Sequence, residues 1–404
     1  MNVSRYWRLV ACCAGPFVTS AFYIWSVFTN PLIQEYGWNL GFIAAGYSFN
    51  QIFAQISSLI FGRVVDRANP RITYLIGLVL FGGGWFLAGC ATSAEMLVFA
   101  YSVVAGIGNG ALYITATSVS QKWFPDKRGF ASGCVIGTAG IAPLLWAPLG
   151  QALLSALGPS TGLCFLGVAF AVIIALALIL MKRPEEGWAP ASMNGASGVA
   201  QTAALEGKKP GQVLKDPVFW LMLIVFTCAA SAGSMIMGHA STICQAMGGL
   251  DAMAAATMVG VLSVASFLGR IGLGAVGDKV GRIKPLVFIT VATCVMCLVS
   301  SQVSGALVIA SLLLIQFCFG GTNTVMNSSC GDLWGSKHVG SNWSLLYIGY
   351  TLSAIIGPTL ASVCFESTGA YSLSFTIAAC IAAFAFVIVL VISKVLKGRG
   401  GQRL

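Results

Sequence analysis

Charged residues are scarce in this chain, and their scarcity decides its class. Only 8% of its 404 residues are Asp, Glu, Lys or Arg, whereas 57% are hydrophobic. Soluble domains normally contain about 25% charged residues, so the composition excludes an ordinary soluble protein. The sequence therefore predicts an integral membrane protein.

Groupings of catalytic residues are also missing. The chain has only 2 His, and no His, Cys or carboxylate cluster has catalytic or metal-ligand spacing, so we expect neither an enzyme nor a metal site. The 13 Cys are scattered through apolar segments. Cys294 and Cys297 form a CxxC without a second pair, which favours packing over redox chemistry. We expect no disulfide and no cofactor.

Long apolar runs are what the chain has in abundance. A helix needs roughly 20 apolar residues to cross a bilayer, and twelve such runs follow one another without the alternating polarity of barrel strands. The first run lacks a cleavage site and reads as a helix rather than a signal peptide. We predict an all-α membrane protein with spans at 7–28, 41–61, 72–90, 96–118, 130–153, 162–181, 218–238, 252–276, 285–301, 306–327, 343–364 and 371–392.

The basic residues predict the orientation. Of 22 Lys and Arg, all except Arg270 lie before or at the start of the first span or follow an even-numbered one. The positive-inside rule assigns that side to the cytoplasm. We therefore expect a multi-pass protein of the cell (plasma or inner) membrane with both termini cytoplasmic. The net charge of +10 is a topology signal and gives no reason to expect a nucleic-acid partner.

The chain divides into two similar halves. The stretch 182–216 is charged and rich in Gly, Ala, Pro and Ser, which indicates a cytoplasmic linker between six-helix bundles at 1–181 and 217–404. The runs GRVVDRANPR and GAVGDKVGRIK follow the second helix of each half, with Asp66 and Asp278 separated by 278 − 66 = 212 residues. Repeated halves with a site near the midplane are typical of transporters.

These Asp-centred loops resemble the signature loops of the major facilitator superfamily, whose loops are thought to act as conformational latches. The alternative is turn chemistry and topology alone. Within that superfamily, the KWFPDKRG run, the FxxWxxFxNP-like end of the first span and the SFLGRxxxGxxxDKxGR block resemble the oxalate/formate antiporter family, which is allied to the monocarboxylate transporters. The loop residues that the resemblance singles out are Gly62, Asp66, Arg67, Gly274, Asp278, Lys279 and Arg282.

Arg270 is the charge that needs an explanation. It lies deep in the run TMVGVLSVASFLGRIGLGAV, where a cation costs at least ~2.5 kcal/mol. A guanidinium matches a carboxylate with two parallel hydrogen bonds, so the residue indicates an anionic ligand. Ser266 and Ser263 lie one and two turns earlier on the same helix face. The alternative is an Arg held by helix-terminal carbonyls or extended toward the cytoplasmic end.

Further substrate-site residues are implied by the resemblance. Tyr23 and Tyr113 align with family tyrosines of the substrate chamber, and other positions align with its remaining walls. Each aromatic residue has the alternative reading of packing or interfacial anchoring. Gln51 is a candidate because an amide inside a span needs a partner. The other aligned positions are Phe319, Asn323, Tyr347 and Tyr350.

Two departures from relatives bear on the substrate. Oxalate-handling relatives carry a lysine at the position aligned with Tyr350, and animal monocarboxylate transporters place an acid at the position of Ser266. A single fixed cation matches a single carboxylate, so we expect a monocarboxylate such as lactate, pyruvate, formate or acetate. The alternatives are another small organic anion, a dicarboxylate (oxalate-type) antiporter and a non-transporting sensor on the same fold.

The sequence leaves two mechanisms of transport coupling open, proton symport and anion exchange. No Asp or Glu lies deep in a predicted span, and His239, at the outer end of the seventh span, is the only span-associated His. It is a candidate for proton symport, although a His near an interface is more often solvated or capping. Without an internal counter-ion, obligatory anion exchange avoids moving a bare Arg270 through the closed state. We expect a monomer.

Overall fold

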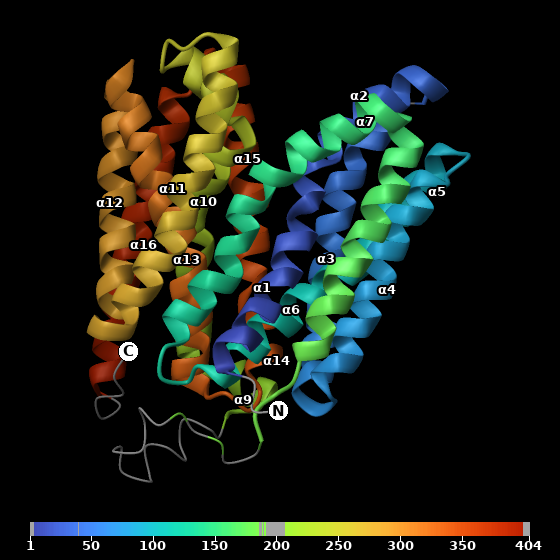
Figure 1. The fold of residues 1–404 in the computed structure, drawn as a ribbon. Helices are drawn as coiled ribbons and strands as arrows, with labels where there is room; N and C mark the ends of the chain where they lie inside the picture. Colours follow the sequence, from blue (N-terminus) through green and yellow to red (C-terminus); the bar gives the residue numbers. More distant parts are fainter. Residues whose placement is uncertain (1–3, 39, 186–187, 189, 191–206, 399–404) are drawn as a thin grey trace. The chain divides into compact units, whose positions relative to one another are not determined.

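The apolar runs form helices. The computed structural model describes residues 4–38, 40–185, 188, 190 and 207–398, and these are almost entirely helical (Figure 1). The elements are α1 (Arg5–Thr19), η1 (Ser20–Ile24), α2 (Trp25–Tyr36), α3 (Leu40–Arg67), α4 (Pro70–Gly89), α5 (Ala94–Val98), η2 (Phe99–Val104), α6 (Ala105–Trp123), α7 (Arg128–Leu180), α9 (Pro210–Val213), α10 (Pro217–Ala246), α11 (Ala252–Val280), α12 (Ile283–Gln302), α13 (Ala306–Trp334), α14 (Val339–Leu346), α15 (Ile348–Thr368) and α16 (Ser372–Gly398).

The predicted spans coincide with continuous helical stretches. Nine stretches of the described chain are long and apolar enough to cross a membrane, and one of them, α7, holds two spans joined at Gly158, where φ is 78°. The elements α1, η1 and α2 run on without a gap, as do α5, η2 and α6. Each of the twelve predicted spans therefore falls on helix to within one residue, and the predicted fold class is confirmed.

Local sequence explains where the helices begin and end. Asn69 and Asp251 accept hydrogen bonds from the backbone N–H groups of Arg71 (3.0 Å) and Ala254 (2.7 Å), which satisfies donors that the first turn leaves unpaired. The glycine that follows α11 has φ 86°, a conformation that only glycine adopts freely.

By its internal contacts the chain forms two compact units. Unit 1 comprises 1–125, 141–190 and 337–345, and unit 2 comprises 126–140, 191–336 and 346–404. Each unit thus includes a short segment from the other half of the sequence. This division follows contacts rather than chain order, so the domain boundaries at 181 and 217 stay a prediction.

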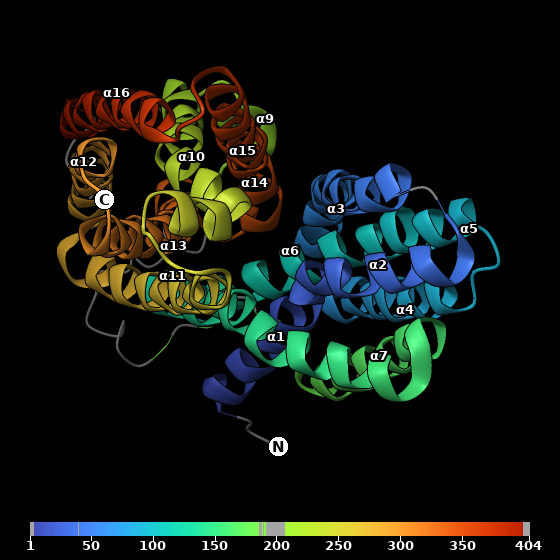
Figure 2. The ribbon, with the colours of Figure 1, turned by 90° about the horizontal axis from the view of Figure 1, so that it is seen from above.

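Unit 2 is held together by close helix contacts. Its helices α11 and α13 lie side by side, as do α12 and α16 (Figures 1 and 2). A Cβ added to Gly269 of α11 would lie 1.8 Å from the Phe317 carbonyl oxygen of α13, and one added to Gly320 would lie 1.9 Å from the Ser266 carbonyl oxygen. Glycine lets the two backbones touch, which fixes the positions of the polar side chains on this contact.

Glycines also allow close contacts between the helices of unit 1. A Cβ added to Gly108 of α6 would lie 2.3 Å from the backbone nitrogen of Phe81 in α4, and one added to Gly110 would lie 2.1 Å from the Ala54 carbonyl oxygen in α3. The rings of Trp25 and Tyr101 stack at a centroid distance of 3.7 Å.

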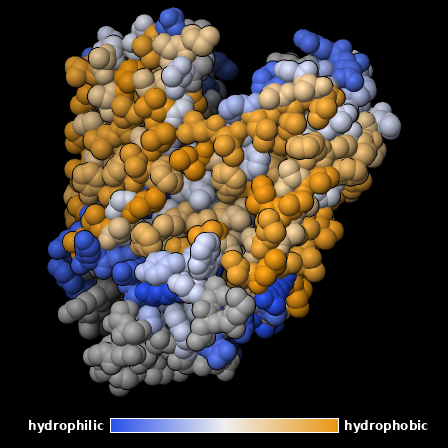
Figure 3. Space-filling view, in the orientation of Figure 1, coloured by the Kyte–Doolittle hydropathy of each residue, from blue (hydrophilic) through white to orange (hydrophobic). Residues whose placement is uncertain are grey.

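The outward faces of the helices are apolar. Figure 3 shows hydrophobic residues over the flanks of the helices and hydrophilic residues gathered toward their ends. Val79, Leu176 and Ile179 expose 59%, 64% and 66% of their surface. Such faces need a hydrocarbon solvent, as expected for a multi-pass membrane protein.

Candidate functional site

Arg270 is buried without a countercharge. The residue lies in α11 with 6% of its surface exposed, and its Nη1 donates a 2.7 Å hydrogen bond to the carbonyl oxygen of Ile136 in α7. Its Nε is buried with no hydrogen-bond partner, and no carboxylate of the described chain pairs with it. The carbonyl belongs to the interior of α7 rather than to a helix end. The guanidinium is therefore held in place but not neutralised.

A glycine makes room for this guanidinium. A Cβ added to Gly140 of α7 would lie 2.9 Å from Nη1 and 3.4 Å from Cζ of Arg270. Gly133, two turns earlier, faces the backbone of the same residue, because its added Cβ would lie 2.6 Å from the Arg270 carbonyl oxygen. Sequence reasoning missed Ile136 and Gly140. The spacing of Gly129, Gly133 and Gly140 along one helix face was the available signal.

Ser266 lies one turn before Arg270 and faces α13. It is 4% exposed, and its Oγ is buried with no hydrogen-bond partner among the residues that the structure describes. A Cβ added to Gly320 would lie 2.9 Å from that Oγ. Ser263, by contrast, donates its hydroxyl to the Val259 carbonyl of its own helix at 3.0 Å. Of the two serines, only Ser266 therefore has a hydroxyl without a hydrogen-bond partner among the described residues.

Helix α13 also carries two buried amides. Asn323 is 4% exposed, and its Oδ1 has no partner in the described part of the chain. Gln316 donates through Nε2 to the Gly233 carbonyl of α10 at 2.9 Å, while its Oε1 is likewise unsatisfied. Buried amide oxygens without donors are uncommon, so this face of α13 has unused capacity to accept hydrogen bonds.

An aromatic cluster forms beside these residues. The ring centroids of Phe319 and Tyr350 lie 5.9 Å apart, and those of Tyr347 and Tyr350 stack at 5.0 Å. The structure thus brings three predicted residues together. It adds Phe226 of α10, whose ring lies 6.0 Å from that of Tyr350. Nothing in the sequence distinguishes Phe226 among 24 Phe.

The predicted residues of unit 1 lie on three elements. Tyr113 is half-buried in α6, and Gln51 is half-buried in α3. Tyr23 falls in η1, but its side chain lies outside the described residues. A buried amide pair that includes Asn50 packs within this unit: Asn109 Nδ2 donates to Asn50 Oδ1 at 3.3 Å.

The first signature loop contacts the start of α14. Asp66 accepts hydrogen bonds from the backbone N–H groups of Ser341 (2.7 Å) and Gly340 (3.2 Å), and it pairs with Lys122 at 3.0 Å. A Cβ added to Gly62 would lie 2.7 Å from the Gly340 carbonyl oxygen. The remaining loop residue, Arg67, is exposed.

The second signature loop makes the corresponding contact with the start of α7. Asp278 accepts from the backbone N–H groups of Gly129 (2.7 Å) and Phe130 (2.8 Å). A Cβ added to Gly274 would lie 2.4 Å from the Gly129 carbonyl oxygen. A carboxylate at a helix N-terminus accepts unpaired backbone donors and opposes the positive end of the helix dipole. Lys279 is exposed.

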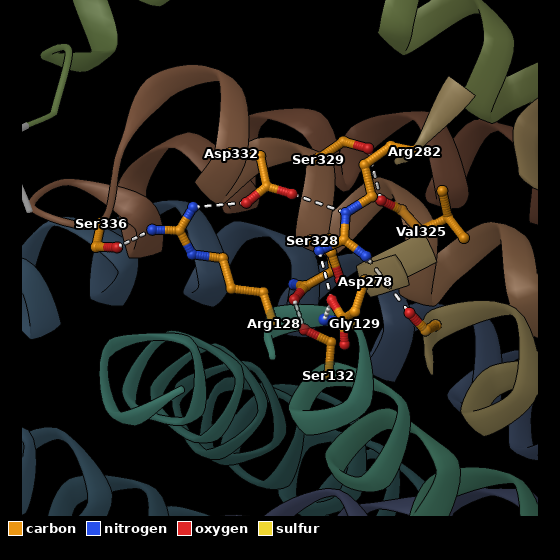
Figure 4. A network of polar contacts seen from close by, with 12 residues as sticks. Arg128, Gly129, Ser132, Asp278, Arg282, Val325, Ser328, Ser329, Asp332 and Ser336 are labelled. Carbon is orange, nitrogen blue, oxygen red and sulfur yellow. Dashed lines mark hydrogen bonds and ion pairs between the residues drawn. The ribbon is translucent and has the colours of Figure 1, made fainter. Parts of the chain in front are cut away.

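An ion-pair network extends from Asp278 (Figure 4). Arg282 pairs with Asp278 and Asp332 at 2.7 Å each, and Arg128 pairs with Asp332 at 2.7 Å and donates to Ser336 Oγ at 2.7 Å. Burial by itself lowers the pKa of Arg282, but the carboxylates of Asp332 and Asp278 outweigh it and raise that pKa above its ordinary value. Sequence reasoning did not single out Arg128 or Asp332.

His239 interrupts α10. Its backbone is non-helical (φ −129°, ψ 22°), and its Nε2 lies 3.1 Å from Ser362 Oγ of α15. Its Nδ1 is buried and has no hydrogen-bond partner within the described ranges. The ring therefore joins two helices of unit 2.

Comparison with known proteins places the chain in a family. Residues 10–341 and 273–402 match the family described as Major Facilitator Superfamily. The chain belongs to the major facilitator superfamily. The fold agrees, since the crystal structure of the Escherichia coli fucose:proton symporter FucP superposes with a TM-score of 0.73 at 15% identity, covering 96% of this chain and 99% of that one. At this identity the likeness shows the fold.

Two curated relatives cover most of this superfamily member. It is 26% identical over 354 residues to the uncharacterized MFS-type transporter YhjX of Escherichia coli (strain K12), covering 87% of this chain and 86% of the relative. It is 24% identical over 389 residues to the oxalate:formate antiporter of Oxalobacter formigenes, covering 94% and 89%. The predicted resemblance to the oxalate/formate antiporter family is therefore confirmed.

Proposed function

We propose that this chain is a secondary active transporter of a small monocarboxylate and has no catalytic role. The observation that carries the proposal is the state of Arg270, which is 6% exposed and, among the described residues, hydrogen-bonded only to a neutral carbonyl. A buried cation without a countercharge is costly, and an anionic ligand relieves that cost.

The hydrogen bond to Ile136 also determines which edge of the guanidinium a ligand would use. Nη1 is engaged at 2.7 Å, and neither Nε nor Nη2 bonds to a described residue. These two nitrogens share one edge, which presents two parallel N–H donors. That edge fits the two oxygens of one carboxylate.

The surrounding atoms favour a substrate with a small second polar group. Ser266 Oγ, one turn before Arg270 in α11, and Asn323 Oδ1, in α13, are both buried and have no hydrogen-bond partner among the described residues. An amide oxygen accepts a hydrogen bond, so a hydroxyl beside the carboxylate is a suitable donor. Among the monocarboxylates considered, lactate carries such a hydroxyl. Pyruvate, formate and acetate lack it and should bind less tightly.

The oxalate-type dicarboxylate antiporter is the second candidate. It is favoured by the relative named as an oxalate:formate antiporter, which shares 24% identity. Against it stands Tyr350, which lies in an aromatic cluster where oxalate-handling relatives have a lysine. Formate, the other substrate in that relative's name, is itself a monocarboxylate.

The mechanism that we propose is alternating access by the two sequence halves. Both termini would be cytoplasmic in the cell membrane, and Asp66 and Asp278 would act as latches through the helix starts that they cap. Coupling would be either proton symport, with His239 as the candidate proton acceptor, or anion exchange. The protein would act as a monomer without a cofactor.

Reconstitution in liposomes tests the proposal. Uptake of radiolabelled lactate is measured with an inward proton gradient, with internal unlabelled lactate, and with neither. Stimulation by the proton gradient indicates symport, and uptake only against internal anion indicates exchange. Absence of uptake in every condition would contradict the monocarboxylate assignment.

Arg270→Lys is the decisive variant, with Ser263→Ala as its control. Lysine keeps the charge but loses the two parallel donors, so lactate affinity should fall by roughly ten- to a hundredfold. Ser263 bonds within its own helix and should be replaceable without effect. Unchanged affinity in Arg270→Lys would refute the site.

A further inference from the structure

An open groove lies between α4 and the last turns of α7. Its volume is about 380 Å³, and its apolar lining comes from Ile72 and Leu75 of α4 and from Ala175, Leu178 and Ile179 of α7. These two segments lie side by side in both ribbon views (Figures 1 and 2). Among the described residues that line it, Arg71, in the first turn of α4, is the one that is polar.

The guanidinium of Arg71 is positioned by the end of α7. Its Nε donates to the Met181 carbonyl oxygen at 3.0 Å, and its Nη2 donates to the Ile179 carbonyl oxygen at 2.9 Å. Its Nη1 has no hydrogen bond to a described residue. Carbonyls at a helix C-terminus carry only about half an elementary charge, so a net positive charge is left at this end of the groove.

Two more arginines gather at the same helix end. Arg8 of α1 reaches the Leu180 carbonyl oxygen at 3.5 Å with Nη1 and lies over the Trp123 ring at 4.4 Å, while its Nε is buried with no hydrogen-bond partner in the described part of the chain. Arg183 donates to the Ala68 carbonyl oxygen. Within the described ranges none of the three forms an ion pair. The charges of Arg8 and Arg71 repel each other, and an anion bound here would relieve that repulsion.

The lining shows what kind of anion fits. Ile72, Leu75 and Ile179 expose 51%, 48% and 66% of their surface, so the groove offers an apolar wall along most of its length and a cation at one end. A soluble anion would use only the arginines. A molecule with a phosphate at one end and an acyl chain behind it would use the whole groove.

We propose that this groove binds an anionic phospholipid, with its phosphate beside Arg71 and one acyl chain along Leu75, Ala175 and Leu178. The direction agrees with the predicted topology, in which Arg71 lies at the cytoplasmic face and the groove runs from there into the hydrocarbon. The site is separate from Arg270 and does not depend on which substrate is carried.

Lipid retention by the full-length protein tests this site. The purified protein is equilibrated in detergent with equal amounts of phosphatidylglycerol and phosphatidylcholine, and bound lipid is counted by native mass spectrometry. We expect phosphatidylglycerol to be preferred, and Arg71→Gln to reduce the preference by roughly fivefold. Arg63→Gln is the matched control, because Arg63 is an exposed arginine in α3 that does not line the groove.

A second variant keeps every arginine. Ala175→Phe fills the groove, whereas Leu176→Phe changes the next residue, which is 64% exposed and outside the lining. Only Ala175→Phe should lose bound phosphatidylglycerol, and this result decides the question if Arg71→Gln does not fold. Full retention in Ala175→Phe would overturn the groove as the site.

Two other outcomes would also overturn the proposal. Equal losses in Arg71→Gln and Arg63→Gln would mean diffuse attraction to basic loops. Displacement of the lipid by millimolar inorganic phosphate would mean that the arginines bind a soluble anion, whereas persistence of the lipid supports the phospholipid.

Discussion

The Nη1 atom of Arg270 donates a 2.7 Å hydrogen bond to the backbone oxygen of Ile136, which lies 134 residues earlier in the chain. Both residues belong to unit 2, because the segment 126–140 packs with α11 rather than with the rest of α7. The charge proposed to bind substrate is therefore oriented by a helix that the sequence order assigns to the other half. Changes on that helix should alter substrate binding.

Gly140→Ala should weaken lactate binding. The new Cβ would lie 2.9 Å from Nη1 of Arg270 and would push the guanidinium from the Ile136 carbonyl. Loss of one such hydrogen bond is worth about 1 kcal/mol, which predicts a rise of roughly fivefold in the KM for lactate. Liposome uptake over a range of lactate concentrations measures it. Gly137→Ala is the control, since its Cβ would meet the Phe267 ring at 3.2 Å and not Arg270. Equal KM values in all three proteins would contradict this role.

Tyr350→Lys should admit a dicarboxylate. Tyr350 contacts Phe226 and Phe319, and a lysine there would add a second cation to unit 2 at the position where oxalate-handling relatives carry one. Oxalate uptake should appear above background while lactate uptake falls, because a fixed second charge favours a dianion. Radiolabelled oxalate in the same liposomes tests the change. Tyr347→Lys, one turn away, is the comparison. If both lysines admitted oxalate equally, position 350 would not determine specificity.

Asp66→Ala should slow transport more than it weakens binding. The variant removes the acceptor for the Gly340 and Ser341 N–H groups at the start of α14. Loss of a helix-capping side chain costs about 1 kcal/mol, enough to shift a conformational equilibrium roughly fivefold. Maximal uptake rate should change while lactate KM stays close to wild type. Arg63→Gln, at an exposed position of α3, should change neither. A change confined to KM would argue against a latch.

Asp332→Asn should destabilise the protein. It leaves Arg128 and Arg282, whose side chains are 4% and 5% exposed, with one fewer countercharge. Breaking buried pairs costs about 3 kcal/mol, at the low end of the measured range because Asp332 keeps 23% of its side chain exposed. Thermal unfolding in detergent measures the loss. Lys182→Gln breaks an exposed 3.8 Å pair with Glu185 and should leave the unfolding temperature unchanged. Equal unfolding temperatures for the two variants would contradict the expectation.

Much of the fold follows from hydropathy, because a bilayer helix must be apolar over its whole length. The apolar runs of α4 and α16 can be recognised from their own residues alone. Arg270 can be recognised because it is a charged residue in an apolar run. The resemblance assigned Phe319, Tyr347 and Tyr350 to one cavity, but the stacking of their rings was not predicted.

The unpredicted features depend on backbone atoms and on distant loops. Every residue carries a carbonyl, so nothing in the sequence distinguishes Ile136 as an acceptor. Asp332 meets Arg128 across 204 positions, and charges in separate loops give no periodic signal. The exchange of the segments 126–140 and 337–345 between units is also invisible to hydropathy, because those residues continue ordinary helices.

The start of α7 connects a signature-loop contact with the proposed substrate site. Its Gly129 N–H bonds to Asp278, and its Ile136 carbonyl bonds to Arg270, 136 − 129 = 7 residues or about 10 Å further along the same helix face. A carboxylate on the Nε and Nη2 edge of Arg270 leaves the Ile136 bond in place, so the charge that it neutralises stays attached to the helix segment that Asp278 caps. Occupancy of the site and the state of the signature loop would therefore be thermodynamically linked through the start of α7.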